Sequence, residues 1–190
     1  IPGQHNILNA MACITLGLQL SIDPEMIAKS LKSFAGVKRR FQIKGTFNDI
    51  MIVDDYGHHP TEVIATLKAA HSVKKKRLIT VFQPHRYSRT KFLMEDFVKA
   101  LSQTDYLILT DIYAASEEPI DGISSEILLN KIHAAGKKDA AYLKKEEITS
   151  YLAKMVRPGD LVLTLGAGDI YQVGEDLLKE MQRQPIFGRH

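Results

Sequence analysis

The organisation of this chain is decided by the segment Ile52-Val53-Asp54-Asp55-Tyr56-Gly57-His58-His59-Pro60-Thr61-Glu62. Two β-branched residues end a strand, and Pro60 opens a helix, because proline suits the first helical position. The polar turn between them adds little to a hydrophobic core, and strand-to-helix turns of this kind commonly bind ligands. The segment therefore predicts a strand, a functional turn and a helix.

Strands and helices alternate after this segment with short links, which predicts an α/β fold with a doubly wound, mostly parallel sheet. Residues 78–82 and 161–165 are nearly continuous apolar runs, as expected of strands covered on both faces. A turn at Asn48-Asp49 joins two strands as a hairpin, so at least one strand is antiparallel. The expected strands cover residues 41–47, 51–55, 78–83, 106–110, 140–143 and 160–165, and the helices cover 60–73, 91–102, 125–134, 146–155 and 170–182.

A different pattern precedes the sheet. Residues 6–19 are densely apolar, and residues 24–35 form an amphipathic helix that Asp23 caps and Gly36 ends. We expect a helical hairpin here, with a domain boundary where the periodicity changes, between residues 36 and 40. Because the chain begins Ile-Pro-Gly without methionine, we also expect a fragment of a longer protein.

Composition argues against several classes of partner. The chain has 190 residues, 45% hydrophobic and 25% charged, as is typical of a globular protein. Its net charge of +3 is too small to indicate nucleic-acid binding. It has no membrane-spanning apolar run, no secretory signal and a single cysteine, Cys13, so we expect a reducing, cytoplasmic compartment and no membrane partner.

The sheet topology predicts where function lies, because parallel strands all end at one edge of the sheet. The links that enter the strands contain ordinary turn residues. The links that leave them are rich in His, Arg, Tyr and Asp, and they cover residues 54–59, 83–89, 111–117 and 166–169. We therefore expect the binding site at the edge where these strands end.

Asp55 and the pair Arg86 and Arg89 are the clearest candidates within these links. Asp55 lies too early to cap the helix at Pro60, which favours a ribose hydroxyl over a capping role. Arg86 and Arg89 are spaced to lie on one side of a tight turn, where they would hold a carboxylate or a phosphate. The alternative is a pair of solvated arginines.

Other candidates leave two interpretations open. Asn6 and Asn9 lie on one helix face, where they would pair with adenine or cap the helix. The Gly166-Ala167-Gly168 turn would admit a phosphate or allow close packing. Arg39 and Arg40 would bind a ligand or remain solvated, and Tyr113 and Glu117 would form a pocket rim. We predict no metal site at His58-His59, because adjacent turn histidines usually point apart and no third ligand is suitably spaced.

Three motifs resemble the Mur ligase family. Residues 3–10, GQHNILNA, resemble the start of a family helix. The more specific pair is DDYGHHPTE at residues 54–62 and FQPHRYSRT at residues 82–90, and the second of these points to the branch that adds alanine. The resemblance extends through Asp169-Ile170.

The resemblance implies a three-domain enzyme. This chain would hold the last helices of the central ATP-binding domain, residues 1–38, and the Rossmann-like C-terminal domain, residues 39–190. No GxxxxGK[ST] motif occurs in the chain, so we expect the phosphate-binding loop and the principal Mg²⁺ ligands upstream. The implied cofactors are ATP and Mg²⁺.

The activity implied by the resemblance is the ATP-dependent joining of L-alanine to UDP-N-acetylmuramate, through an acyl phosphate, in peptidoglycan precursor synthesis. We expect the fragment alone to be inactive. Two alternatives are a ligase that attaches a recycled tripeptide to the same sugar nucleotide, and a nucleotide-binding module without catalysis. The implied site has nucleotide-binding residues His5, Asn6, Asn9, Arg40 and Asp55, alanine-binding residues Tyr56, His58, Arg86 and Arg89, and His58 as the candidate acceptor of the amine proton.

Overall fold

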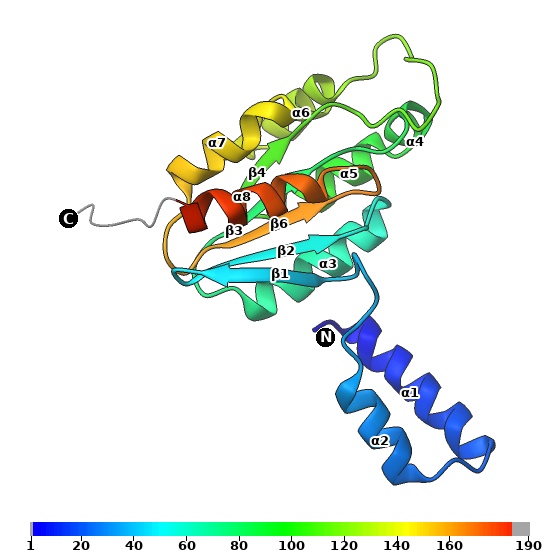
Figure 1. Ribbon diagram of the computed structural model, residues 1–190. Helices are drawn as coiled ribbons and strands as arrows, with labels where there is room; N and C mark the ends of the chain where they lie inside the picture. The colour runs from blue at the N-terminus through cyan, green and yellow to red at the C-terminus, as the bar shows by residue number, and fades with distance from the viewer. Residues whose placement is uncertain (1, 184–190) are drawn as a thin grey trace.

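The computed structural model describes residues 2–183, apart from the side chain of His5 (Figure 1). It consists of a helical pair followed by an α/β part. The helical pair contains α1 (Gln4–Gln19) and α2 (Pro24–Ser33), and it projects away from the sheet. Asp23 accepts a hydrogen bond from the backbone of Glu25 and so caps α2, as predicted.

The α/β part is built on a six-stranded sheet in the order β1-β2-β6-β3-β4-β5. The pair β1–β2 is antiparallel, and every other neighbouring pair is parallel, which confirms the predicted fold class. The last strand along the chain, β6, lies between β2 and β3. The strands are β1 (Gln42–Phe47), β2 (Ile50–Asp55), β3 (Leu78–Phe82), β4 (Tyr106–Leu109), β5 (Ala140–Tyr142) and β6 (Leu161–Leu165).

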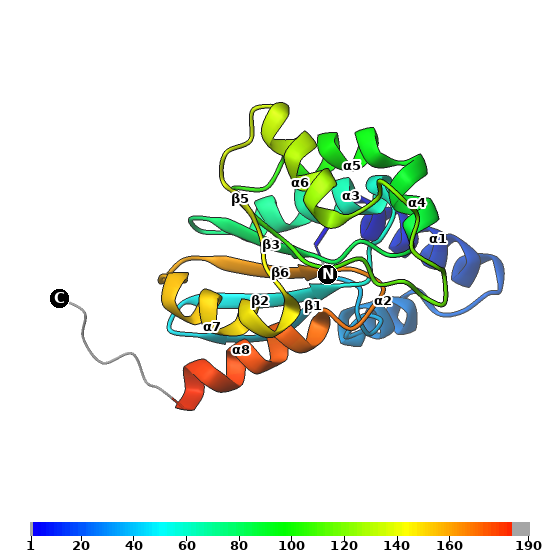
Figure 2. The same cartoon turned by 90° about the horizontal axis from the view of Figure 1, so that it is seen from above.

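Helices cover both faces of the sheet, as Figure 2 shows. Val53 and Leu163 point to a core shared with α3, α5 and α6. Their neighbours Ile52 and Val162 point to the opposite core, shared with α7 and α8. This alternation explains why the central strands are apolar throughout. The helices are α3 (Pro60–Val73), α4 (Tyr87–Phe92), α5 (Met94–Leu101), α6 (Ser125–Ala134), α7 (Lys145–Met155) and α8 (Tyr171–Arg183).

The prediction of one helix over residues 91–102 was wrong. The helical segment begins at Tyr87 and is interrupted at Leu93, which gives α4 and α5. The first turn of α4 is held by the carboxylate of Glu117, which accepts bonds from the backbone and the hydroxyl of Ser88. A contact across 29 positions leaves no local sequence signal.

Apolar side chains lie exposed on the helical pair. Helix α2 has no buried residue, and α1 exposes Ile7, Leu8, Met11 and Leu16. The pair therefore stabilises itself weakly, since its apolar surface remains in water. Within the described residues, no helix is both long and apolar enough to cross a bilayer.

Candidate functional site

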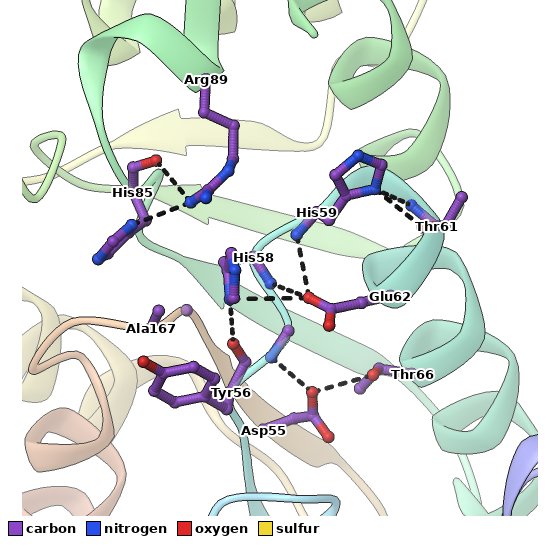
Figure 3. Close-up of polar contacts among 12 residues, drawn as sticks. Asp55, Tyr56, His58, His59, Thr61, Glu62, Thr66, His85, Arg89 and Ala167 are labelled. Atoms are coloured by element: carbon purple, nitrogen blue, oxygen red, sulfur yellow. Dashed lines mark hydrogen bonds and ion pairs between the residues drawn. The ribbon is translucent and has the colours of Figure 1, made fainter.

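The candidate site lies where the parallel strands β2, β6, β3 and β4 end. These strands are neighbours and run in the same direction. The links that follow their last residues, called exit links below, therefore meet at one edge of the sheet. The structure thus brings together the links after β2, β3 and β4, with the glycine turn after β6 beside them. Figure 3 shows His58, His85, Arg89 and Tyr56 gathered at this edge.

Asp55 organises the turn after β2. The residue is 5% exposed, and its carboxylate accepts hydrogen bonds from the backbone of Phe41 (2.7 Å), the backbone of Gly57 (2.8 Å) and the hydroxyl of Thr66 (3.1 Å). These bonds fix the direction in which the chain leaves the strand. A ribose hydroxyl would have to reach the remaining acceptor position of this largely buried carboxylate, so that contact stays a prediction.

The helix after this turn is capped by His59 and Glu62. The His59 ring accepts from the backbone of Thr61, and the Glu62 carboxylate accepts from the backbone of His58 (3.0 Å) and His59 (3.2 Å). Burial alone would raise the pKa of Glu62, but these bonds and the nearby cations lower it below its ordinary value. Figure 3 shows the His59 ring turned away from that of His58. The capping bonds hold His58 at the sheet edge.

His58 has its hydrogen-bonding roles set by the backbone. Its Nδ1 lies 3.0 Å from the carbonyl oxygen of Tyr56. Because a carbonyl can only accept, Nδ1 carries the hydrogen of the neutral ring, and Nε2 keeps a free lone pair. The Tyr56 ring meets the imidazole edge-on at 5.4 Å. In the neutral ring, the Nε2 lone pair of His58 is therefore available to accept a proton.

His85 is a site residue that the sequence reasoning left unassigned. Its ring lies 5.6 Å from the His58 ring and stacks on Tyr113 at 5.5 Å. The backbones of residues 84–86 and Tyr113 are joined by two hydrogen bonds of 2.8 Å, which fix the ring between two exit links. Burial and the neighbouring Arg89 lower the pKa of His85 to about 4. The available sequence signal was its position in the exit link beside Arg86.

The two predicted arginines have different partners. Arg86 is the N-cap residue of α4 and has a positive φ of 74°, and its guanidinium lies 3.8 Å from Glu117. Arg89 donates from Nη1 to Nδ1 of His85 (3.0 Å) and to the carbonyl oxygen of His85 (3.2 Å). Both arginines lie at the predicted edge, but Arg89 is the one that hydrogen-bonds to His85.

Arg39 ties the start of the α/β part to the sheet edge. It donates to the buried carboxylate of Asp54 (3.0 Å) and to the carbonyl oxygens of Gly166 (2.6 Å) and Gly168 (2.9 Å). Burial raises the pKa of Asp54, although a hydrogen bond from Thr164 and the charge of Arg39 act against this. The solvated-linker interpretation was wrong for Arg39. Its contacts favour the packing interpretation of the glycine turn.

Arg40, in contrast, is an exposed residue. Its side chain is 53% exposed and lies 3.6 Å from Glu62. A guanidinium in this position is free to meet an anionic ligand at little cost, since an exposed ion pair is weak. The nucleotide contact that the family resemblance implies for Arg40 stays a prediction.

The candidates on α1 belong to the helical pair that projects away from the sheet (Figure 1). Asn6 donates to the carbonyl oxygen of Pro2 at 2.8 Å, which supports a role at the helix start, and Asn9 is exposed. The side chain of His5 lies outside the described residues. Within residues 2–183, neither asparagine forms a hydrogen bond with Arg40 or Asp55. The described side chains also contain no group of three His, Cys, Asp or Glu residues that could hold a metal ion.

Comparisons with known proteins agree with this architecture. Residues 39–168 match the family model described as "Mur ligase, glutamate ligase domain". Proteins named UDP-N-acetylmuramate--L-alanine ligase from Geotalea uraniireducens and Acetivibrio thermocellus are each 52% identical to this chain over 183 residues. The aligned region covers 96% of this chain but only 40% and 39% of those relatives.

Solved structures of Mur ligases have the same fold as this chain over most of its length. The UDP-N-acetylmuramate-alanine ligase of Thermotoga maritima superposes with a TM-score of 0.78 and 29% identity, covering 96% of this chain and 39% of that one. A murein peptide ligase from Psychrobacter arcticus shares the fold, with a TM-score of 0.66 and 21% identity, covering 97% of this chain and 38% of that one. The family match extends over most of the α/β part, from Arg39 to the glycine turn after β6. The chain therefore belongs to the Mur ligase family.

Proposed function

We propose that this chain is the C-terminal part of an ATP-dependent ligase that joins L-alanine to UDP-N-acetylmuramate. The names of the most similar relatives support the reaction, and their greater length supports a longer enzyme. Residues 1–38 would be the last helices of its central ATP-binding domain, whose other parts would cover the exposed apolar side chains of the helical pair. Residues 39–190 would form the C-terminal domain.

The main support for the proposal is that the exit links after β2 and β3 lie side by side at the sheet edge. The link after β2 places His58 beside the link after β3, which contributes His85 and Arg89. His58, which would accept a proton, and Arg89, which would hold a carboxylate, thus both neighbour His85. These are the groups that an incoming amino acid requires, because its carboxylate must be held and its amine must lose a proton.

The chemistry would proceed as an acyl transfer. The alanine nitrogen attacks the carbonyl carbon of the muramoyl phosphate, the C–N bond forms, and the C–O bond to phosphate breaks. The amine must also lose a proton, and Nε2 of His58 would accept it. The Tyr56 carbonyl holds the other ring nitrogen, so the acceptor is oriented before the substrate arrives. Tyr56 would form one wall of the alanine pocket.

ATP and Mg²⁺ are the cofactors of the proposed reaction. ATP would supply the phosphoryl group, with Asn6, Asn9, His5, Arg40 and Asp55 as the proposed nucleotide contacts in this chain. The carboxylates at the edge do not fit a principal Mg²⁺ site, because Asp54, Asp55 and Glu62 are already engaged by protein donors. We place the metal ligands and the phosphate loop in another part of the enzyme.

Steady-state kinetics of the full-length enzyme tests the proposal. L-Alanine should support ATP- and UDP-N-acetylmuramate-dependent phosphate release, whereas the tripeptide of the recycling ligases should not. Arg86→Ala should raise the KM for alanine by about one to two orders of magnitude, since a charge-assisted bond is worth roughly 1.5–3 kcal/mol. The KM for ATP should change far less.

Other outcomes would assign the site differently. If Arg86→Ala leaves the KM for alanine unchanged but alters the KM for ATP, or alters kcat measured with ATP varied, then Arg86 binds phosphate. Unchanged constants would mean that Arg86 contacts neither substrate. Preference for the tripeptide over alanine would contradict the proposed reaction.

A further inference from the structure

His85 holds Arg89 through a neutral acceptor. The distances from Nη1 of Arg89 to Nδ1 and to the carbonyl oxygen of His85 are 3.0 and 3.2 Å. A guanidinium only donates, so Nδ1 of His85 must be the unprotonated ring nitrogen. Figure 3 shows Arg89 reaching from its helix toward His85 with both contacts drawn. The ring therefore offers Arg89 a hydrogen-bond acceptor, the Nδ1 lone pair, with a defined direction.

Several features keep His85 in this state. The ring is stacked on Tyr113, and the backbone around it is bonded to Tyr113 on both sides, so its orientation is fixed. Burial, Arg89, His58 and Arg86 all disfavour the protonated ring, while Glu117 favours it. Near neutral pH the ring is uncharged, and its Nδ1 lone pair remains available to Arg89.

A neutral partner distinguishes Arg89 from most arginines in the α/β part. Ion pairs with carboxylates are formed by Arg39, Arg40, Arg77 and Arg86. Across residues 2–183, Arg89 forms no such ion pair; its hydrogen-bond acceptors are the ring and the carbonyl oxygen of His85. Its positive charge is thus held in place but not compensated. An anionic ligand can meet this charge without displacing a carboxylate of the protein.

The unused donors of Arg89 have the geometry that a carboxylate needs. Both contacts with His85 start from Nη1, which leaves Nε and Nη2 on the neighbouring edge of the guanidinium. That edge is the planar fork that binds a carboxylate bidentately. Holding Nη1 therefore reduces the rotamer freedom that ligand binding would otherwise remove.

We propose, on the basis of the function proposed above, that His85 is a positioning residue that fixes Arg89 as the principal anchor of the amino-acid carboxylate. Arg86 would contribute a second contact with the carboxylate, although Glu117 at 3.8 Å already compensates some of its charge. His85 acts on the carboxylate only through Arg89.

The test compares His85→Phe and His85→Asn in the full-length ligase, with each substrate varied in turn. Phe keeps a flat ring against Tyr113 but removes the acceptor, whereas the Asn oxygen can take the place of Nδ1. His85→Phe should raise the KM for alanine roughly tenfold, as expected for one charge-assisted bond that loses its alignment. His85→Asn should recover most of this loss. His133→Phe, an exposed histidine on α6, is the matched control and should leave the constants unchanged.

A double-substitution cycle separates positioning from general damage. In an Arg89→Ala background, His85→Phe should add no further rise in the KM for alanine, because the residue through which it acts is gone. The KM for ATP should stay within about twofold of the wild-type value if the fold is intact. An unchanged KM for alanine in His85→Phe, or a full additional rise in the Arg89→Ala background, would overturn the assignment.

Two further results complete the design. If His85→Phe does not fold, ¹⁵N NMR of the wild-type enzyme labelled in its histidine rings decides: Nδ1 should be unprotonated and Nε2 protonated, and a protonated Nδ1 contradicts the assignment. If Arg89→Ala and Arg86→Ala both leave the KM for alanine unchanged, the proposed alanine pocket fails as a whole. If Arg89→Ala raises that KM while His85→Phe does not, only the role of His85 fails.

Discussion

Nε of Arg39 lies 3.0 Å from Oδ2 of Asp54, whose side chain has no exposed surface. The Cζ atom of the same guanidinium lies over the rings of Tyr56 and Tyr171, at 5.0 and 4.7 Å from their centroids. Arg39 thus joins the segment before β1 to the end of β2 and to the turn after β6. The ion pair holds together the walls of the candidate site.

Removing Arg39 should be far more damaging than removing its neighbour. We expect Arg39→Ala to lower the free energy of unfolding by about 3–5 kcal/mol, because it leaves the buried carboxylate of Asp54 without its cation. Arg40→Ala breaks an exposed pair with Glu62 and should cost less than about 1 kcal/mol. Urea denaturation of both variants makes the comparison. Equal losses would contradict the structural role of Arg39.

Arg86 has a strained backbone, which predicts a conflict between stability and function. Its φ of 74° with ψ of 138° lies where glycine is favoured. Arg86→Gly should therefore be more stable than Arg86→Ala by about 1 kcal/mol, as strain of this kind costs roughly 1–3 kcal/mol and glycine loses some entropy. Both variants should lose the same alanine affinity. Thermal unfolding measures the difference, and an Ala variant at least as stable as the Gly variant would show that the backbone is relaxed.

The two adjacent histidines should differ sharply in catalysis. His58→Asn removes the Nε2 lone pair and should lower kcat of the full-length enzyme by about 10²-fold or more, the usual contribution of a general base. His59→Asn keeps a good helix N-cap and should retain near-normal turnover. Single-turnover kinetics at saturating substrate separates the chemical step from binding. Similar losses in both variants would indicate damage to the turn rather than loss of a base.

His85 should make stability depend on pH. Its folded-state pKa of about 4 lies below the ordinary 6.5, so between these values the unfolded chain binds more protons than the folded one. The contribution of His85 is fully present above about pH 6.5 and is lost as the pH falls toward 4. The wild type should lose about 2 kcal/mol more than His85→Asn over that range, after a discount for solvent screening. Denaturation at pH 7.5 and 4.5 tests this, and equal losses would mean that His85 titrates normally.

The helical pair should be the least stable part of the 190-residue chain. Helix α2 buries no residue, and many apolar side chains of α1 are exposed, whereas β3 and β6 are buried along their whole length. Amide hydrogens of residues 6–35 should therefore exchange much faster than those of the two strands. Mass spectrometry of deuterium uptake by peptide segments provides the measurement. Equal protection would show that the pair is stabilised by packing that its exposed surface does not reveal.

The sequence by itself determined the layout of the fold. Continuous apolar runs predicted the central strands, and the Asn48-Asp49 turn predicted the antiparallel pair. Pro60 and Asp23 marked helix starts correctly. These signals succeed because hydrophobic periodicity and turn chemistry act between residues close in the chain. The same topology placed His58, Arg86 and Arg89 at one edge.

Only the tertiary structure decided which of these polar residues are partners. Arg39 reaches Asp54 and Gly168 across 15 and 129 positions, and Ser88 meets Glu117 across 29. The charge state of His85 depends on burial and on Arg89, which packing alone supplies. Such contacts depend on how layers and loops come together in three dimensions, so no local pattern encodes them. The edge of the site was predictable from sequence, whereas the division of roles between its arginines and histidines required the fold.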